Sequence, residues 1–204
     1  MAEFAPQVSS ARIRLGLVSD THIPEAGEEL FPQVYEAFVG VEAILHAGDI
    51  YDLSVIERLG TIAPVYAARG NGDDGSGGRM RQPEHEWLRE GWVLEFGGVT
   101  IGLTHALPVP SYGDYTLERA AARYFGDVAL DVAVHGDTHV EDIREVDGVL
   151  CVNPGSPTFP HNLNLQYGTV GFLDITDGHA EASIWRLTDH GIEPFDWDTW
   201  GRPW

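Results

Sequence analysis

The segment VAVHGDTHVED, residues 132–142, places two histidines and one aspartate within five residues, directly after an apolar run. These residues are His135, Asp137 and His139. Imidazole nitrogens and carboxylate oxygens are the ligands that borderline and hard divalent metals use in proteins. The segment therefore predicts a buried strand that delivers metal ligands at its carboxyl end.

Similar polar residues follow four other predicted strands. These strands end in SDTH (19–22), HAGD (46–49), RGNGD (69–73) and LTH (103–105). Open α/β sheets bind their ligands outside the carboxyl ends of the strands, so we expect the five ends to lie together. The candidate metal ligands are Asp20, His22, Asp49, Asn71, His105, Asp137 and His139.

Each motif alone also has an ordinary structural explanation. Asp20 or Asp49 would serve as a helix cap, and Asn71 with the glycine after it is a common turn dipeptide. A single histidine at a strand end is more often structural than a ligand. All five ends in one chain are hard to obtain from capping and turns alone, so we favour a metal site.

Two further motifs near Asn71 fail as signatures of a binding site. Residues 70–75 spell G-x-G-x-x-G after a strand, but Asp73 and Asp74 lie where a pyrophosphate needs amides and positive potential. A calcium loop that starts at Asn71 fails because its twelfth position is Gln82 and not an acid. Neither a dinucleotide nor a calcium site is expected.

The elements that must position the candidate ligands alternate at first between strand and helix. Hydrophobic patterning predicts strands over 12–20, 41–49 and 63–71, and helices over 30–40 and 53–60. A long polar loop follows at 70–87. The later part predicts hairpins over 92–105, 142–156 and 168–187, a helix over 114–126 and a strand over 129–137. This order indicates parallel units first and hairpins later.

The bulk composition is that of one globular domain. The chain has 204 residues, with 43% hydrophobic and 22% charged side chains. We expect a flexible arm at 1–11, a single domain at 12–190 and a Trp-rich tail at 191–204. The tail is expected to dock on its own core; a homodimer contact is the alternative.

The charge narrows the class of partner. The net charge is −20, and all 12 basic residues are arginines. So acidic a chain repels nucleic-acid backbones and anionic membranes, which favours a small-molecule substrate over duplex nucleic acid or a membrane. The first ten residues do not resemble a secretory signal, no apolar run reaches membrane-spanning length, and the single Cys151 excludes an intramolecular disulfide. We expect a cytoplasmic protein.

The ordered set D-x-H, G-D, G-N-x-D, strand-end histidine and G-x-T-H resembles the signature of the calcineurin-like metallophosphoesterases. The segment VNPGSPTFP, 152–160, resembles the small YfcE-type bacterial and archaeal phosphodiesterase branch. The resemblance runs from about Arg14 to about Trp185. It implies an α/β (α+β) fold, a four-layer αββα sandwich of two mixed β-sheets flanked by helices, as in the metallo-dependent phosphatases.

The resemblance also implies a site with two divalent metal ions. The first ion would be held by Asp20, His22, Asp49 and His139, and the second by Asp49, Asn71, His105 and Asp137. Asp49 would bridge them, and Asp49, Asn71 and His105 would be the catalytic residues. The implied activity is hydrolysis of small phosphodiesters by in-line attack of a metal-bridging hydroxide. Mn²⁺ is favoured, with Mg²⁺, Fe, Zn²⁺ or Ni²⁺ as alternatives.

Asp137 departs from the family pattern, which has histidine at this position. We favour Asp137 as a ligand of the second metal. Alternatively it orients another ligand, or the second metal binds weakly and activity is reduced. As a ligand, Asp137 lowers the formal charge of the site by one unit, raises the pKa of the bound water and favours Mn²⁺ or Mg²⁺.

Two other positions depart from the pattern. Gly72 stands where many members have a histidine that protonates the leaving group, so good leaving groups should be favoured. Asp73 is a possible substitute, but an exposed aspartate is ionised at neutral pH, which favours a structural role for it. His161 stands where members often have arginine, which leaves a contact to the substrate phosphate in doubt.

Two other functions compete with phosphodiester hydrolysis. A scaffold that has lost catalysis is compatible with Asp137 and the aromatic tail, but it would not need the other ligands, which keep their usual types. A nuclease is disfavoured by the acidic charge and the lack of a basic groove. The remaining histidines have ordinary explanations: His46 and His135 near the site, and His85, His179 and His190 on the surface.

Overall fold

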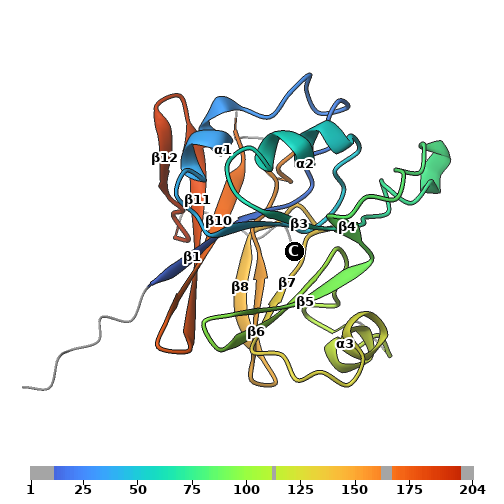
Figure 1. The fold of residues 1–204 in the computed structure, drawn as a ribbon, viewed down its shortest axis with the longest axis vertical. Coiled ribbons are helices and arrows are strands. Elements are labelled where there is room, and N and C mark those ends of the chain that lie inside the picture. Colours follow the sequence, from blue (N-terminus) through green and yellow to red (C-terminus); the bar gives the residue numbers. More distant parts are fainter. Residues whose placement is uncertain (1–11, 112–113, 162–166, 199–204) are drawn as a thin grey trace, which may run out of the picture.

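The structure is a computed structural model that describes residues 12–111, 114–161 and 167–198. Two β-sheets pack face to face, and helices cover both outer faces (Figure 1). Both sheets mix parallel and antiparallel pairs, so the predicted four-layer sandwich of two mixed sheets is confirmed. The predicted arm at 1–11 lies outside the described residues.

The larger sheet has seven strands in the order β12-β11-β10-β1-β2-β3-β4. Its parallel part is β1 (Ile13–Val18), β2 (Ala43–His46), β3 (Val65–Ala68) and β4 (Leu88–Arg89). Its antiparallel part is β10 (Thr169–Thr176), β11 (His179–Thr188) and β12 (Gly191–Pro194). The parallel strands bring the ends of β1, β2 and β3 to one edge of this sheet.

The smaller sheet has five strands in the order β5-β6-β7-β9-β8. They are β5 (Gly91–Phe96), β6 (Val99–Thr104), β7 (Val132–Val134), β8 (Asp142–Val146) and β9 (Val149–Asn153). Strands β6, β7 and β9 run parallel. The hairpin between β8 and β9 turns at Asp147–Gly148, where both residues have positive φ, as the predicted Asp-Gly turn requires.

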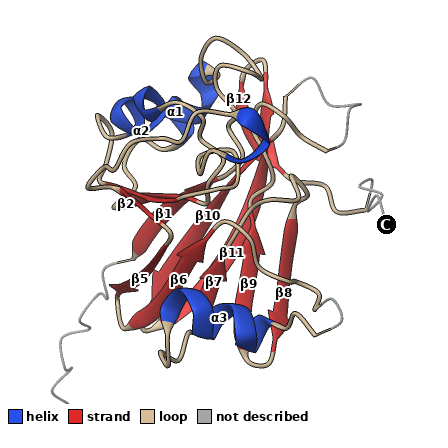
Figure 2. Cartoon of the chain, turned by 90° about the vertical axis from the view of Figure 1, so that its right-hand side faces the viewer, coloured by secondary structure: helices blue, strands red, loops and turns tan. Residues whose placement is uncertain are grey.

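In the described part of the chain, helices α1 (Pro32–Ala37), α2 (Leu53–Leu59) and α3 (Leu117–Phe125) cover the outer faces (Figure 2). Helices α1 and α2 lie on the larger sheet, and α3 lies on the smaller one. Local chemistry explains where they begin. Pro32 stands in the first turn of α1, where its missing N–H is not needed. The Asp52 carboxylate accepts the Ser54 N–H at 2.8 Å, and Thr116 caps α3 in the same way.

The apolar core follows the alternation of the strands. On β2, Ala43 and Leu45 face the smaller sheet, whereas Ile44 faces the layer of α1 and α2. Phe38 packs so closely on β1 that a Cβ on Gly16 would lie 2.6 Å from its ring. Cys151 is a buried free thiol in the layer under α3, as expected.

Part of the predicted tail belongs to the larger sheet. Residues 191–194 form β12, which pairs with β11, and this edge strand has too few apolar residues to be recognised by pattern. Phe195 is buried in the core between the sheets and packs on Trp197, with ring centres 4.8 Å apart. The start of the tail thus docks on its own core, while 199–204 lies outside the described residues.

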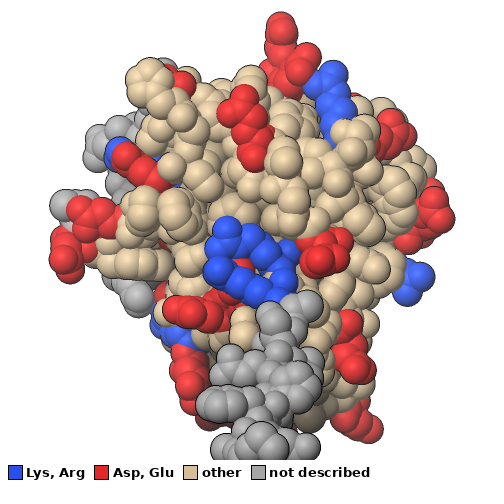
Figure 3. All heavy atoms as spheres, turned by 60° about the vertical axis from the view of Figure 1, so that its left-hand side comes forward, with Lys and Arg blue, Asp and Glu red and all other residues tan. Residues whose placement is uncertain are grey.

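Acidic side chains are spread over the face of the molecule that Figure 3 shows. Figure 3 shows one face on which acidic side chains lie scattered between uncharged ones, with a few arginines among them. That face carries no continuous basic stripe of the kind that tracks a nucleic-acid backbone. Among the described residues, no helix has the length and apolar character needed to cross a bilayer.

Candidate metal centre

The predicted ligands all follow the ends of parallel strands. Asp20 and His22 follow β1, Asp49 follows β2 and Asn71 follows β3. From the smaller sheet, His105 directly follows β6, and Asp137 and His139 follow β7. Because both sheets present these ends to the same side, the fold brings the predicted residues of five strands into one cluster.

The cluster has a buried floor and an exposed rim. Asp20 is fully buried, and His22, Asp49 and His105 are at most 8% exposed. Asn71, Asp137 and His139 lie at the surface or are half-buried. Burying a charged acid or a charged histidine costs free energy because the group loses its hydration, unless an opposite charge lies nearby. The buried acids of the floor are therefore suited to bind a cation.

Distances between side-chain atoms show two overlapping groups. His139 Nε2 lies 3.5 Å from Asp20 Oδ1, and with His22 these residues form one possible ligand group. Asp20, Asp49 and His105 form another. In the second group His105 Nε2 lies 3.3 Å from Asp49 Oδ1 and 3.1 Å from Asn71 Oδ1.

The two carboxylate oxygens of Asp49 face different histidines. Oδ2 lies 3.3 Å from His22 Nε2, and Oδ1 lies 3.3 Å from His105 Nε2. Oδ1 also accepts the Gly72 N–H at 2.7 Å. A carboxylate that presents one oxygen to each half of the cluster has the arrangement needed to bridge two ions.

Asp137 lies at the edge of the cluster. Its Oδ1 is 3.5 Å from His105 Nε2, and 48% of its side chain is exposed. Its backbone N–H points at the Asp20 carboxylate, 3.2 Å from Oδ2. Asp137 thus touches the second group through His105 and supports the first through its backbone.

The ring nitrogens of the histidines fit metal ligation. Nδ1 of His105 lies 2.7 Å from the Ala47 carbonyl, and Nδ1 of His139 lies 2.7 Å from the Phe159 carbonyl. A carbonyl only accepts, so each Nδ1 donates its proton to the backbone, and Nε2 is the ring nitrogen that faces the cluster. His22 Nε2 is buried and has no hydrogen-bond partner, which is the unsatisfied ligand atom expected at such a site.

The backbone at the cluster is held in the left-handed region. Asp20, His22, Asp49, Asp137 and His139 have φ of 54°, 48°, 54°, 73° and 57°. Residues other than glycine rarely adopt this region, and such strain collects at functional sites. Aspartate and histidine enter this region more readily than most residues, and its recurrence at five candidate ligands agrees with a functional site.

The electrostatics of the floor are strongly coupled. Burial lowers the pKa of His22, but the carboxylates of Asp20 and Asp49 outweigh this and raise it to about 9. Burial likewise lowers the pKa of His105, and the nearby acids more than reverse it. Burial alone would raise the pKa of Asp49, yet His22 and His105 hold it below its ordinary value. At pH 7 the raised pKa of His22 keeps a proton on this ring, and that positive charge offsets part of the charge of the acids.

Metal binding should therefore release protons. Because the raised pKa keeps His22 protonated at pH 7, a metal must displace that proton. We expect the apparent affinity for Mn²⁺ to rise about tenfold per pH unit for this one proton, and to level off near pH 9. Calorimetric titration in buffers of different ionisation enthalpy measures the released protons directly. An affinity that does not change between pH 6 and 8 would contradict the raised pKa.

Asp73 differs from the expectation that it is exposed. It is fully buried, and its carboxylate accepts N–H groups of Ile50, Tyr51 and Gly70 at 2.8–3.2 Å. Burial raises its pKa, partly offset by these hydrogen bonds. The loop-ordering role favoured from the sequence agrees with these contacts, which tie the ends of β2 and β3 together.

A steric constraint that the sequence did not show explains the glycine at position 72. A Cβ at this position would lie 1.9 Å from the Tyr51 ring. Tyr51 itself has φ of 72° and stacks on His22, with ring centres 4.3 Å apart. Tyr51 therefore occupies the space beside Asn71 in which a side chain at 72 would stand.

Several residues that hold the site were missed. The Ser156 hydroxyl donates to the Asp20 carbonyl at 2.7 Å, and the Thr158 hydroxyl donates to the Thr21 carbonyl at 2.6 Å. The Ser19 hydroxyl donates to Asp20 Oδ2 at 2.6 Å. The signal available for Ser156 and Thr158 was the segment 152–160, to which no role was given.

The other histidines mostly lie where expected. His46 and His135 are buried behind the cluster, where burial lowers their pKa to about 3 and about 4. His179 and His190 are exposed, whereas His85 is half-buried beside Trp87. His161 is exposed and donates its N–H to the His139 carbonyl at 3.2 Å, beside the rim.

Comparison with known proteins assigns the fold and the cluster to one class. The sequence profile of the calcineurin-like phosphoesterase superfamily domain matches residues 13–178. A probable metallophosphoesterase of Methanothermobacter thermautotrophicus is 36% identical over 173 residues, which cover 84% of this chain and 91% of that protein. A phosphodiesterase of Methanocaldococcus jannaschii is 29% identical over 70% of this chain and 83% of its own length. The chain therefore belongs to the calcineurin-like phosphoesterase superfamily, and the small phosphodiesterase branch fits.

Solved structures agree with the fold. Vacuolar protein sorting 29 of Cryptosporidium parvum superimposes with a TM-score of 0.68 at 24% identity, covering 89% of this chain and 95% of that one. An archaeal phosphodiesterase superimposes with a TM-score of 0.58 at 25% identity, covering 84% and 99%. At this identity the first similarity shows the fold alone.

Proposed function

We propose that the protein is a metal-dependent phosphodiesterase that acts on small phosphodiesters at a site for two divalent ions. The observation that carries the proposal is Asp49, whose two carboxylate oxygens face His22 and His105 at equal distances. The first ion would be held by Asp20, His22, Asp49 and His139, and the second by Asp49, Asn71, His105 and Asp137. When bound, such a pair polarises the phosphoryl group and activates a water for in-line attack.

The residues of the chain supply position and charge. The hydrogen bonds from His105 and His139 to backbone carbonyls fix which ring nitrogen faces the site. Hydroxyl groups of Ser19 and Ser156 hold Asp20 in place from its side chain and its backbone. Because these groups are already oriented, little reorganisation is needed when charge develops on the phosphoryl oxygens.

Positions 72 and 73 offer the leaving group no proton donor. The Gly72 position is closed by Tyr51, and the Asp73 carboxylate is occupied by backbone N–H groups. Esters with good leaving groups, such as nitrophenolates and cyclic diesters, are therefore the preferred substrates in our proposal. The Asp137 carboxylate adds a hard oxygen ligand, which favours Mn²⁺ or Mg²⁺.

The proposal is tested with bis(4-nitrophenyl) phosphate and a panel of phosphomonoesters, diesters and cyclic nucleotides, each with Mn²⁺, Mg²⁺, Zn²⁺ and Ni²⁺. We expect turnover of diesters, fastest with Mn²⁺. If no substrate is turned over with any metal, the alternative of an inactive scaffold on the same fold is favoured. A cytoplasmic location and a homodimer stay predictions.

A further inference from the structure

A cleft lies directly beside the ligand cluster. Its volume is about 390 Å³, within the size range of small-molecule sites. Its walls include Tyr51, which stands two residues after Asp49, and Gly72, which follows Asn71. They also include the loop that carries Arg79 and Arg81. Two of the 12 arginines of a chain with a net charge of −20 thus line a single cleft. Glu25 and Asp52 line the same cleft, so an anion would be bound there by direct contact with a guanidinium group and not by a net positive field.

Tyr51 connects this cleft to the cluster. Its ring centre lies 4.3 Å from that of His22 and 4.7 Å from the guanidinium carbon of Arg79, which lies over the ring. The distance from the Arg79 guanidinium carbon to the centre of the His22 ring is therefore at most the sum of these two distances. A group bound to Arg79 could therefore belong to the same small molecule as a phosphoryl group at the cluster. The two groups would be separated by about the width of the Tyr51 ring.

The guanidinium of Arg79 is oriented and keeps free donors. Its Nε and Nη2 each lie 3.3 Å from a carboxylate oxygen of Glu25, which forms a fork. An arginine has five N–H donors, so this pair leaves others for a ligand. The side chain is 37% exposed and reaches solvent within the cleft. Arg79 is therefore held in place and still able to bind an oxyanion.

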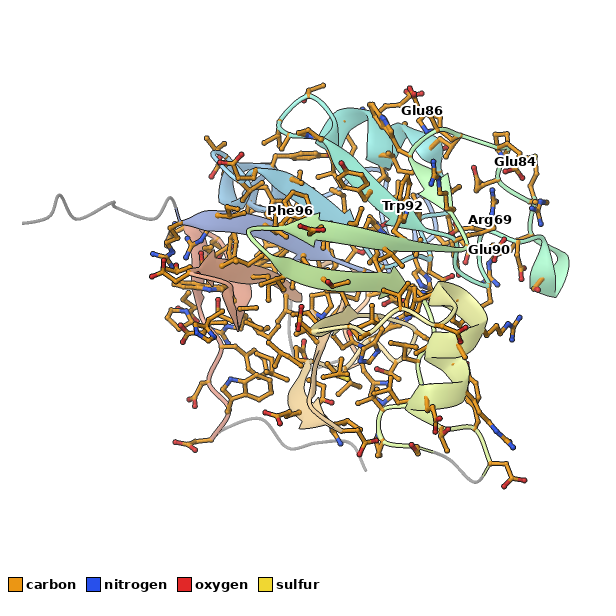
Figure 4. The ribbon with its side chains drawn as sticks, turned by 60° about the horizontal axis from the view of Figure 1, so that its bottom comes forward. Arg69, Glu84, Glu86, Glu90, Trp92 and Phe96 are labelled. Carbon is orange, nitrogen blue, oxygen red and sulfur yellow. The ribbon has the colours of Figure 1, made fainter. Side chains whose placement is uncertain are left out.

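The loop that carries Arg79 is fixed at its base. Buried Arg69 donates from Nη1 to the carbonyls of Asp73 and Gln82, which stand at the two ends of this loop. Figure 4 shows Arg69 beside Glu90, and Arg69 Nε lies 3.5 Å from Glu90 Oε1. The Gln82 side chain in turn donates to the Tyr51 carbonyl at 2.6 Å. These contacts tie the loop to Tyr51, so the cleft is a built feature.

We propose that Arg79 is a specificity-determining residue that binds a second phosphate on a phosphodiester substrate, while the scissile phosphoryl group lies at the ligand cluster. This inference rests on the proposed function and narrows its substrate class to diesters that carry an additional phosphate. The oriented guanidinium, its free donors and its position one ring away from His22 carry the assignment. Charge-assisted bonds between guanidinium and phosphate supply the preference.

Two substrates that differ only in the second phosphate test this directly. They are the 4-nitrophenyl esters of thymidine 5′-phosphate and of thymidine 3′,5′-bisphosphate, the latter esterified at the 5′-phosphate. We expect the wild-type protein with Mn²⁺ to show a higher kcat/KM for the bisphosphate ester. In Arg79→Gln the ratio of the two values should fall about tenfold, as expected for one charge-assisted contact.

Two further variants test the direction of the effect on this ratio and provide a control. Glu25→Gln removes a carboxylate that would repel a second phosphate, while the amide oxygen can still accept from the Arg79 guanidinium, so the ratio should rise. Arg58→Gln removes the same charge from another arginine–glutamate pair, with Glu29, outside the cleft, and should leave the ratio unchanged. A ratio that does not respond to Arg79→Gln, or falls equally in Arg58→Gln, overturns the proposal.

A binding measurement separates this inference from the proposed function. Thymidine 3′,5′-bisphosphate and thymidine 5′-phosphate are titrated calorimetrically into the Mn²⁺-loaded protein and into Arg79→Gln. Tighter binding of the bisphosphate that is lost in the variant supports the inference even when neither ester is hydrolysed, in which case the proposed function alone fails. Equal affinity for both nucleotides in the wild-type protein refutes it.

Discussion

Asp49→Asn should lower kcat/KM for bis(4-nitrophenyl) phosphate by at least about 10³, a loss of about 4 kcal/mol of transition-state stabilisation. The Asp49 carboxylate presents one oxygen to His22 and the other to His105. An asparagine keeps the shape but offers one oxygen and an amide nitrogen, which is not a metal ligand. One half of the proposed site would therefore lose its shared ligand, and the negative charge between His22 and His105 would be removed.

The matched control for this variant is Asp174→Asn. Asp174 pairs with Arg14 near the start of β1, at the opposite end from Asp20, so the same chemical change there should leave activity intact. Metal content and thermal melting are measured for both variants, so that unfolding is not mistaken for lost chemistry. Wild-type turnover in a folded Asp49→Asn protein would exclude Asp49 from the reaction.

The second large effect is expected from Asp137→His, which should shift metal preference. Asp137 lies 3.5 Å from His105 Nε2, and its exposed side leaves room for an imidazole. Its φ of 73° is accepted by histidine more readily than by most residues, so little backbone strain is added. Replacing a hard carboxylate by an imidazole should raise the ratio of Zn²⁺ to Mn²⁺ activity about tenfold or more.

Asp137→Asn separates the effect of charge from that of the new ligand. It removes the negative charge without supplying a nitrogen ligand, so it should weaken binding of the second metal with no shift toward Zn²⁺. Metal stoichiometry by calorimetry and anomalous scattering at each site are the readouts. Unchanged preference and activity in both variants would show that Asp137 does not ligate a metal.

The clustering of the candidate ligands and the parallel strands were predictable from the sequence because each signal is local. A buried strand shows itself by its apolar run, and the polar residues at its end stand next to it in the chain. Since parallel neighbours such as β1 and β2 must align their carboxyl ends, Asp20 and Asp49 had to meet. Strand β4 was missed because it has only two residues, and β12 because its sequence, Gly-Ile-Glu-Pro, contains a single aliphatic residue.

Local pattern did not reveal how buried or how constrained a polar residue is. Asp73 was expected to be exposed, yet the backbone N–H groups of Ile50 and Tyr51 close around it from another strand end. The glycine at 72 was visible in the sequence, but its cause, the Tyr51 ring, comes from 21 positions earlier in the chain and is evident only in space.

The sequence by itself determined the residue types, their order and the strands that end in them, because these are properties of neighbouring positions. Only the tertiary structure decided that Asp49 faces two histidines and that Asp137 lies at the rim. It also decided that Arg79 stands over Tyr51 beside the cluster. These relations join segments far apart in the chain, and they depend on the direction in which the packed fold holds each side chain.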